Sequence, residues 1–135
     1  MFYKLGEASR RELETCEERL KKLVEIAIKI TPIDFSITQG YRTQAYQKKM
    51  FEAGKSKTLD SKHCHNPSFA FDFVPFINGK QDYQARDDIM FLAGLFYGVA
   101  KMLNIDIRSG ALWNGNNIKN NNFIDAFHIE LKEEK

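Results

Sequence analysis

The sequence lacks the features that would assign it to a membrane, secreted or nucleic-acid-binding class. No segment approaches the roughly 18 consecutive apolar residues that a transmembrane helix needs. The N-terminus has no apolar stretch of the signal-peptide type, so we expect synthesis without a secretory signal. The formal net charge is only +2, and nothing in that balance demands nucleic acid as a partner.

Cysteine is also scarce. The two cysteines, Cys16 and Cys64, are too few for a disulfide framework, which indicates a reducing compartment of synthesis. Cys16 falls on the apolar side of an expected helix and is interpreted as a small core residue. Cys64 lies between two histidines, and we interpret it as a loop residue. The alternative is a redox-sensitive or substitute metal ligand.

What the chain does contain is enough apolar material for one folded domain. Its 135 residues are 43% hydrophobic and include 11 Phe. Apolar spacing and turn residues predict alternating helices and short strands. The expected helices are 9–30, 43–53 and 83–103, and the expected strands are 35–38, 69–75, 105–108 and 127–131. We therefore predict a single α+β domain over residues 1–135, with helices packed on a small, mostly antiparallel sheet.

Local signals refine this outline. Ser9 is the expected N-cap of the first helix, with Glu12 at the capping-box position. Pro75 is expected to end its strand, and the pair Asn78-Gly79 is typical of a two-residue hairpin turn. Residues 55–68 and 114–122 are polar and are expected to be loops.

A set of histidines and carboxylates suggests a metal site. The chain has three histidines, and Asp72 follows His63 by nine residues and His65 by seven. His128 is preceded three residues earlier by Asp125. Two imidazoles and a carboxylate are the ligands of a catalytic zinc ion that keeps one position open for water. Each residue alone is more typical of an ordinary structural side chain, and the spacing leaves the choice between His63 and His65 open.

The order of these motifs resembles that of the zinc D-Ala-D-Ala carboxypeptidase family, and within it the phage L-alanyl-D-glutamate endopeptidases, or endolysins. The similar segments are Gly40-Tyr41-Arg42, Ser61-Lys62-His63, Ala70-Phe71-Asp72, Asp125-Ala126-Phe127-His128 and the closing strand through Leu131. The resemblance runs from about residue 35 to 131. This chain departs from the family pattern at Ser68, at Phe127 and in the turn near Trp113, where the family tends to have Gly, Pro and a Gly/Trp-rich turn.

The resemblance implies roles for individual residues. His63, Asp72 and His128 would be the ligands of a zinc ion, and Asp125 the general base. Arg42 would stabilise the oxyanion. Ser61 and Gln47 would form hydrogen bonds with the substrate or support the metal ligands. These two stand with Arg42 and Asp125 as the non-ligand members of the predicted site.

The family also helps to choose between the two neighbouring histidines. Its commonest spacing between the ligand histidine and the ligand aspartate would select His65. The Ser-x-His pattern and the flanking residues 66–68 favour His63 instead, with a longer loop. We therefore predict His63.

The implied activity is cleavage of the stem peptide of bacterial peptidoglycan at the L-Ala–D-Glu bond by a zinc-dependent monomer. The enzyme would act on the cell wall after release, without membrane insertion. Two alternatives stand beside it. One is a D-Ala-D-Ala dipeptidase or carboxypeptidase with the same chemistry. The other is a cell-wall-binding module on the same fold that has lost catalysis.

Overall fold

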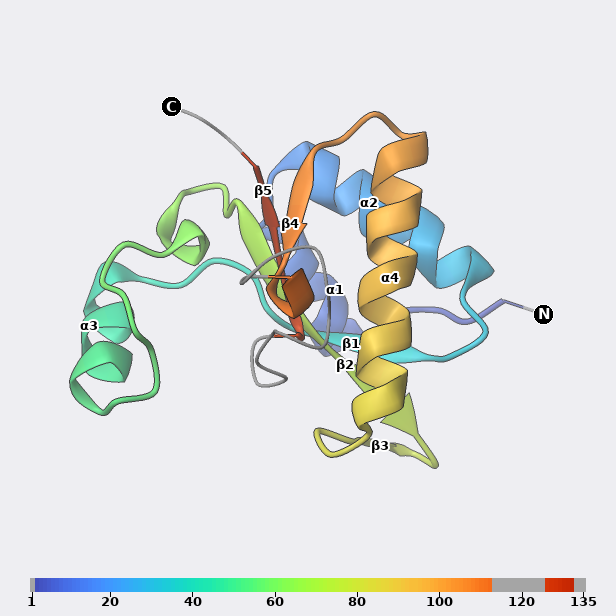
Figure 1. Ribbon diagram of the computed structural model, residues 1–135, viewed down its shortest axis with the longest axis horizontal. Helices are drawn as coiled ribbons and strands as arrows, with labels where there is room; N and C mark the ends of the chain where they lie inside the picture. Colours follow the sequence, from blue (N-terminus) through green and yellow to red (C-terminus); the bar gives the residue numbers. More distant parts are fainter. Residues whose placement is uncertain (1, 113–125, 133–135) are drawn as a thin grey trace.

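The computed structural model describes residues 2–112 and 126–132, and five strands of this part form one sheet (Figure 1). Their order is β1-β2-β5-β4, with β3 pairing β2, and every pairing between named strands is antiparallel. The strands are β1 (Phe35–Gln39), β2 (Ala70–Ile77), β3 (Lys80–Gln81), β4 (Ile107–Ser109) and β5 (His128–Leu131). The predicted antiparallel sheet is confirmed.

Helices pack on this sheet, as the predicted α+β class requires. They are α1 (Glu7–Glu14), α2 (Glu18–Ile30), α3 (Gln44–Glu52) and α4 (Arg86–Met102), with short 3-10 turns η1 (Lys62–Cys64) and η2 (Gly110–Leu112). Within the described ranges, no helix has both the length and the apolar character to cross a membrane. The predicted 114–122 loop lies outside the described residues.

The hydrophobic core lies on one face of β2. Successive side chains of a strand point to opposite faces, so Phe71 and Phe73 share a face that Asp72 does not. The ring of Phe96 on α4 packs against both, with centroids 5.2 Å from Phe71 and 4.9 Å from Phe73. Phe35 on β1 joins them at 5.1 Å from Phe96. The aromatic face of the sheet is thus covered by α4, and Asp72 lies on the opposite face.

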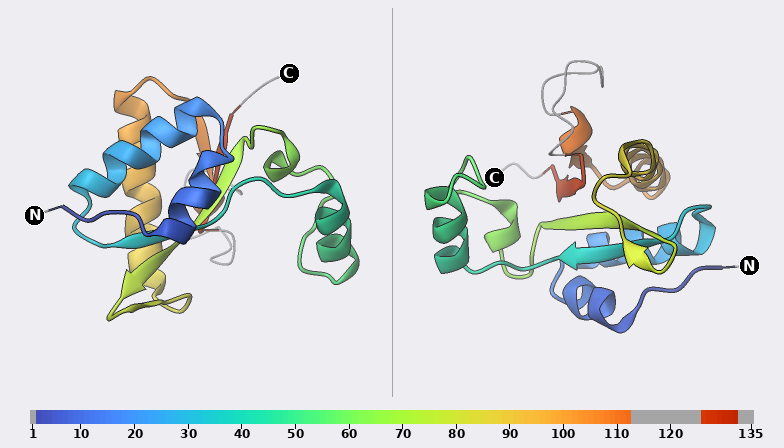
Figure 2. Two further views of the ribbon diagram at one scale, coloured as in Figure 1. Left: turned by 180° about the vertical axis from the view of Figure 1, so that it is seen from behind. Right: turned by 90° about the horizontal axis from the view of Figure 1, so that it is seen from below.

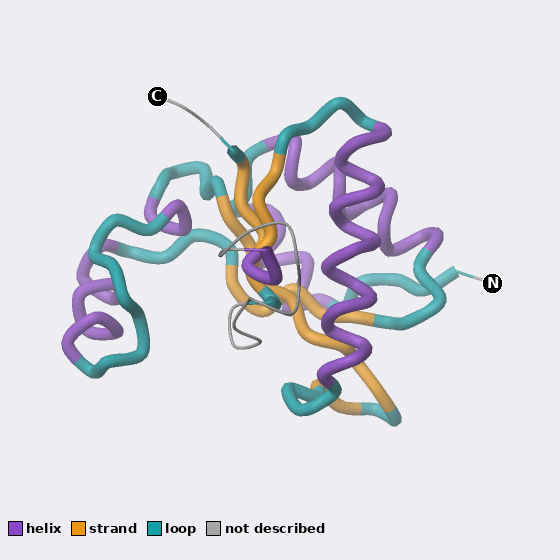
Figure 3. The backbone as a smooth tube through the Cα atoms, in the orientation of Figure 1, coloured by secondary structure: helices purple, strands orange, loops and turns teal. Residues whose placement is uncertain are grey.

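Helix α3 stands apart from the other helices. The views in Figures 1 and 2 place it beyond the end of the sheet, on the side away from α2 and α4. Figure 3 shows that loops join it to the rest of the chain on both sides. The predicted helix over 43–53 is confirmed, with the Thr43 side chain accepting a hydrogen bond from the backbone N–H of Tyr46 at 3.1 Å. The buried residue of α3 is Gln47, which is polar, so apolar burial contributes little to its position.

The predicted single helix over 9–30 is wrong, because the chain leaves the helix at Thr15 and re-enters it at Glu18. Between these points the backbone bonds to the loop before β2. The N–H of Ser68 donates to the Thr15 carbonyl at 2.8 Å, and Glu17 N–H donates to the Ser68 carbonyl at 2.9 Å. The Glu17 carboxylate then caps α2 by accepting from the N–H of Arg19 at 2.7 Å. Tertiary hydrogen bonds therefore override a continuous helical pattern.

Ser9 is not the N-cap that the sequence predicts. The cap position of α1 is Gly6, and Ser9 is buried within the helix. Its hydroxyl oxygen accepts a hydrogen bond from the backbone N–H of Ile37 at 3.0 Å. Because β1 is the edge strand of the sheet, this bond satisfies a donor that no neighbouring strand reaches, and α1 covers the edge.

Strand β2 does not end at Pro75 as predicted, but continues to Ile77. The N–H of Phe73 donates toward the β5 side, to the Phe127 carbonyl at 3.0 Å. Pro75 lies two residues further on, so its missing N–H falls on the same side, beyond the end of β5. No ladder bond is lost. The predicted turn at Asn78-Gly79 is confirmed, with positive φ angles of 52° and 82°.

Gly40 follows β1 at a point where a side chain has no room. A Cβ atom there would collide with the Thr15 hydroxyl and with the backbone carbonyl oxygen of Glu12. We predict that Gly40→Ala lowers the free energy of unfolding by about 1–3 kcal/mol, because a backbone atom must move. Urea denaturation measures this.

The matched control is Gly94→Ala in α4, where a Cβ meets nothing within 4 Å. Because alanine is the better helix former, that variant should gain about 0.5–1 kcal/mol. A Gly40→Ala protein as stable as the wild type would contradict the close packing of residues 12–16 against Gly40.

Candidate metal centre

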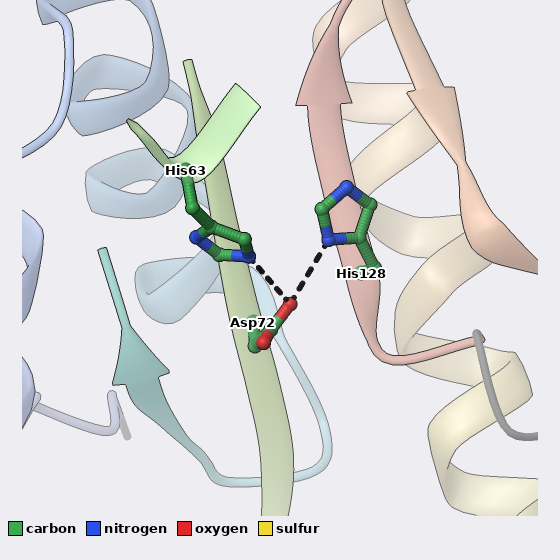
Figure 4. Close-up of side chains that lie close together, drawn as sticks. All are labelled: His63, Asp72 and His128. Atoms are coloured by element: carbon green, nitrogen blue, oxygen red, sulfur yellow. Dashed lines mark hydrogen bonds and ion pairs between the residues drawn. The ribbon is translucent and has the colours of Figure 1, made fainter. Parts of the chain in front are cut away.

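Three side chains from separate elements converge on the face of the sheet opposite the aromatic core. They are His63 from η1, Asp72 from β2 and His128 from β5 (Figure 4). Their nearest nitrogen and oxygen atoms all lie within 4.8 Å of one another. Asp72 Oδ1 lies 3.2 Å from His63 Nε2 and 3.1 Å from His128 Nδ1. Both imidazoles thus face a single carboxylate oxygen.

Strand register brings two of these residues together. Asp72 and His128 are direct partners in the antiparallel β2–β5 ladder, so their side chains leave the sheet on the same face. The neighbours Phe71 and Phe73 are fully buried on the other face. The alternation that buries these two rings is therefore what presents the carboxylate to His128.

His63 reaches the centre from a loop. It is buried, with 2% of its surface exposed, and its Nδ1 lies 2.8 Å from the carbonyl oxygen of Gly40. A carbonyl only accepts hydrogen bonds, so Nδ1 carries the proton and Nε2 faces Asp72. The Ser61 hydroxyl oxygen accepts from the His63 backbone N–H at 3.1 Å and caps η1. Ser61 therefore orders the turn that carries His63.

His128 is held through both ring nitrogens. Its Nδ1 faces Asp72, and its Nε2 lies 2.9 Å from Glu130 Oε1. Burial alone would lower the pKa of His128, but hydrogen bonding to Asp72 and Glu130 outweighs burial and raises it to about 9. Burial alone would likewise raise the pKa of Asp72, but the charge of His63 and hydrogen bonds from both histidines hold it well below its usual range. The negative charge of the Asp72 carboxylate is thus balanced by the two imidazoles beside it.

His65 is not part of this cluster. Its ring stacks on Phe69 with a centroid separation of 4.3 Å, and the residue is exposed. The structure thus brings His63, and not His65, together with Asp72 and His128. The Cys64 thiol faces the Thr43 carbonyl at 3.9 Å, and the cluster found among the described residues does not include it.

Arg42 and Gln47 lie behind Asp72 as a connected pair. Arg42 Nη2 approaches Asp72 Oδ2 at 3.7 Å, and Nη1 donates to Gln47 Oε1 at 2.7 Å. The Gln47 amide nitrogen donates to the Ser56 hydroxyl at 2.8 Å and to the Thr58 carbonyl at 2.7 Å. Gln47 is completely buried, so the structure places it in contact with Arg42 and the 56–58 loop, away from the surface. The predicted base, Asp125, lies outside the described residues.

The sequence analysis missed the charged residues behind His128. Glu130 is a buried carboxylate whose Oε2 lies 3.3 Å from Arg108 Nη1 and 3.7 Å from Lys62 Nζ. A period-two signal was available, because Glu130 follows His128 by two residues on the same strand and so shares its face. The same pattern could not predict that Lys62, nearly seventy residues earlier in the sequence, contacts Glu130.

The donor set fits a divalent metal ion. Two neutral imidazole nitrogens and one carboxylate oxygen are the three-ligand set of catalytic zinc sites, which leave a coordination position open. His63 keeps its Nδ1 proton on the Gly40 carbonyl and directs Nε2 toward Asp72, so Nε2 is the nitrogen that would bind the ion. A cation would replace the hydrogen bonds that now join the imidazoles to the carboxylate.

We predict that His63→Ala abolishes stoichiometric zinc binding, whereas His65→Ala retains it. Removing His63 leaves two ligands, while His65 lies outside the cluster. Zinc content after dialysis, measured by atomic emission, decides between them. Loss of zinc from the His65→Ala protein, with zinc retained by His63→Ala, would contradict the proposed ligand set.

Comparisons with known proteins agree with this fold. A sequence model of the family described as phage L-alanyl-D-glutamate peptidase matches residues 1–132. The L-alanyl-D-glutamate peptidase of Escherichia phage T5 is 35% identical over 137 residues, which cover 97% of this chain and 99% of that protein. The crystal structure of the Serratia marcescens L-Ala D-Glu endopeptidase ChiX has the same fold, with a TM-score of 0.80 at 24% identity over 96% of this chain and 90% of that one. Because the family match spans nearly the whole sequence, this chain belongs to the phage L-alanyl-D-glutamate peptidase family.

Proposed function

We propose that this protein is a zinc-dependent peptidase that cleaves the L-Ala–D-Glu bond in the stem peptide of bacterial peptidoglycan. The observation that carries the proposal is the convergence of His63, Asp72 and His128 in a chain of this peptidase family. Both imidazoles and the carboxylate face one point, which is the arrangement that a metal-dependent hydrolase needs. A zinc ion held there would polarise a peptide carbonyl and lower the pKa of water to near neutrality.

Asp125 is the proposed general base. It precedes His128, a proposed metal ligand, by three residues. A carboxylate in that position takes a proton from the attacking water and returns it to the leaving amine. The proposal rests on the sequence motif and its resemblance to the family pattern.

Arg42 is proposed to stabilise the negative charge that develops on the carbonyl oxygen during attack. Its guanidinium is positioned before substrate arrives, since Gln47, Gln39 and Asp72 all contact it. Only 9% of the residue is exposed, so its charge acts at short range with little screening by water. Gln47 and Ser61 are proposed to support this chemistry by holding Arg42 and η1.

The location of the proposed substrate determines where the enzyme would act. Peptidoglycan lies outside the cytoplasm, so the enzyme would act on the cell wall after release from the host cytoplasm, as a monomer and without membrane insertion. Two other functions would use the same fold: removal of terminal D-Ala by a carboxypeptidase, and wall binding without catalysis. We favour the endopeptidase because the family match and the phage T5 relative both carry that activity in their names.

Digestion of purified peptidoglycan tests the reaction. We expect muropeptides with a new N-terminal D-Glu, detected by mass spectrometry, and loss of this activity on chelation with recovery on adding zinc. Release of terminal D-Ala as the main product would support the carboxypeptidase instead. Binding without any cleavage, in zinc-loaded protein, would support the wall-binding module.

We predict that Asp125→Ala retains zinc but lowers kcat by about 10²–10⁴-fold, because proton transfer loses its base while the ligands remain. Zinc content and single-turnover kinetics are measured on the same sample. The matched control is Asp106→Ala, an exposed aspartate in the described part of the chain, which should keep both zinc and activity. An active Asp125→Ala enzyme would refute the assigned base.

A further inference from the structure

We propose that Glu130 is a positioning residue that holds the His128 imidazole so that Nδ1 faces the metal, and that Lys62 and Arg108 hold Glu130 in turn. This inference rests on the proposed zinc-dependent function. It assigns a purpose to a charged cluster around the buried Glu130, on the far side of His128 from Asp72. We name Lys62, Arg108 and Glu130 the rear cluster.

Strand geometry puts Glu130 in position for this role. Residues two apart on a strand share a face, so Glu130 and His128 both leave β5 on the polar side of the sheet. Glu130 Oε1 lies 2.9 Å from His128 Nε2, while His128 Nδ1 lies 3.1 Å from Asp72 Oδ1. The ring is therefore clamped between two carboxylates, one on each nitrogen.

The two oxygens of Glu130 face different partners. Oε1 faces His128, whereas Oε2 faces Arg108 Nη1 at 3.3 Å and Lys62 Nζ at 3.7 Å. The Glu130 side chain is only 9% exposed, so its charge needs compensation from these cations. With Oε2 held by the cations, Oε1 stays directed at the imidazole. The carboxylate can rotate away only by giving up both ion pairs.

Lys62 extends the rear cluster to the other histidine. Its Nζ also donates to the Leu131 carbonyl at 2.6 Å, so it contacts β5 at two points. Lys62 immediately precedes His63 in η1. One lysine thus links the turn that carries the first imidazole to the strand that carries the second.

The position of the imidazole proton determines which ring nitrogen can bind a metal. A neutral imidazole carries one proton, and a nitrogen that carries it cannot ligate. An acceptor at Nε2 keeps the proton there and leaves the Nδ1 lone pair free. The Gly40 carbonyl plays the same part for His63 at the opposite nitrogen, 2.8 Å from Nδ1. Each histidine thus has its own acceptor, one from the backbone and one from Glu130.

A substitution series separates positioning from simple stabilisation. Glu130→Gln keeps an acceptor and loses the charge, whereas Glu130→Leu removes both. We expect zinc affinity, measured by competition with a chromophoric chelator, to fall in the order wild type, Gln, Leu, with the Leu variant about 10–100-fold weaker. Urea denaturation of the metal-free variants separates the two effects, because removing one partner of a buried ion pair lowers stability with or without zinc. The affinities are therefore compared for protein that is folded before zinc is added.

Proton NMR gives a second test, because it detects the Nε2 proton of His128 directly. In the zinc-loaded wild type, the Nε2 proton of His128 should give an exchange-protected, low-field resonance in proton NMR, and the Leu variant should lose it. The matched controls are Glu52→Gln and Glu52→Leu at an exposed glutamate of α3, which should bind zinc like the wild type. Retention of the resonance in Glu130→Leu would count against the proposal.

One result of the zinc-affinity measurements would contradict the proposal. Zinc binding by Glu130→Leu within about threefold of wild type would overturn the inference and leave the proposed function intact. Failure of the wild type itself to bind zinc would overturn both. If Glu130→Leu does not fold, the nearly isosteric Glu130→Gln decides alone: weaker zinc binding supports the proposal, and unchanged binding overturns it.

Discussion

The pairing of β2 with β5 is the constraint on which the rest of the site depends. It sets Asp72 opposite His128 and, by the same register, buries Phe71 against α4. A slip of one residue would turn the carboxylate into the aromatic core and a phenylalanine toward the histidines. The free energy of burying the aromatic face therefore fixes the geometry of the polar face. Stability and site geometry are not separate properties here.

Around that pair, single residues each make several of the contacts that satisfy the polar groups of the site. Gly40 binds His63 through its carbonyl, and its lack of a side chain lets the chain pass close to Glu12 and Thr15. Gln47 links Arg42 to the 56–58 loop. Within the described ranges, no buried side-chain nitrogen or oxygen lacks a hydrogen-bond partner. A centre so fully connected is pre-organised, and each supporting residue acts through the ones it contacts.

Local patterns predicted much of the fold, and their failures share one cause. The hairpin at Asn78-Gly79 and the helix that begins after Thr43 depend on neighbouring residues alone, and both were predicted correctly. The break at residues 15–17 depends on Ser68, more than fifty residues away. The continuation of β2 through Pro75 depends on where β5 ends. A sequence pattern reports local preference, and these two features are decided by distant partners.

By itself, the sequence determined the chemistry available to this protein: three histidines, a few carboxylates in a characteristic order, and an amphipathic scaffold that folds as α+β. Only the tertiary structure decided which of them meet. It brought His63 to Asp72 and turned His65 onto Phe69. It also placed Glu130 and Lys62 behind His128. The reason is physical: ligand type is a property of a residue, whereas convergence within a few ångströms depends on strand register and burial, which the whole chain sets together.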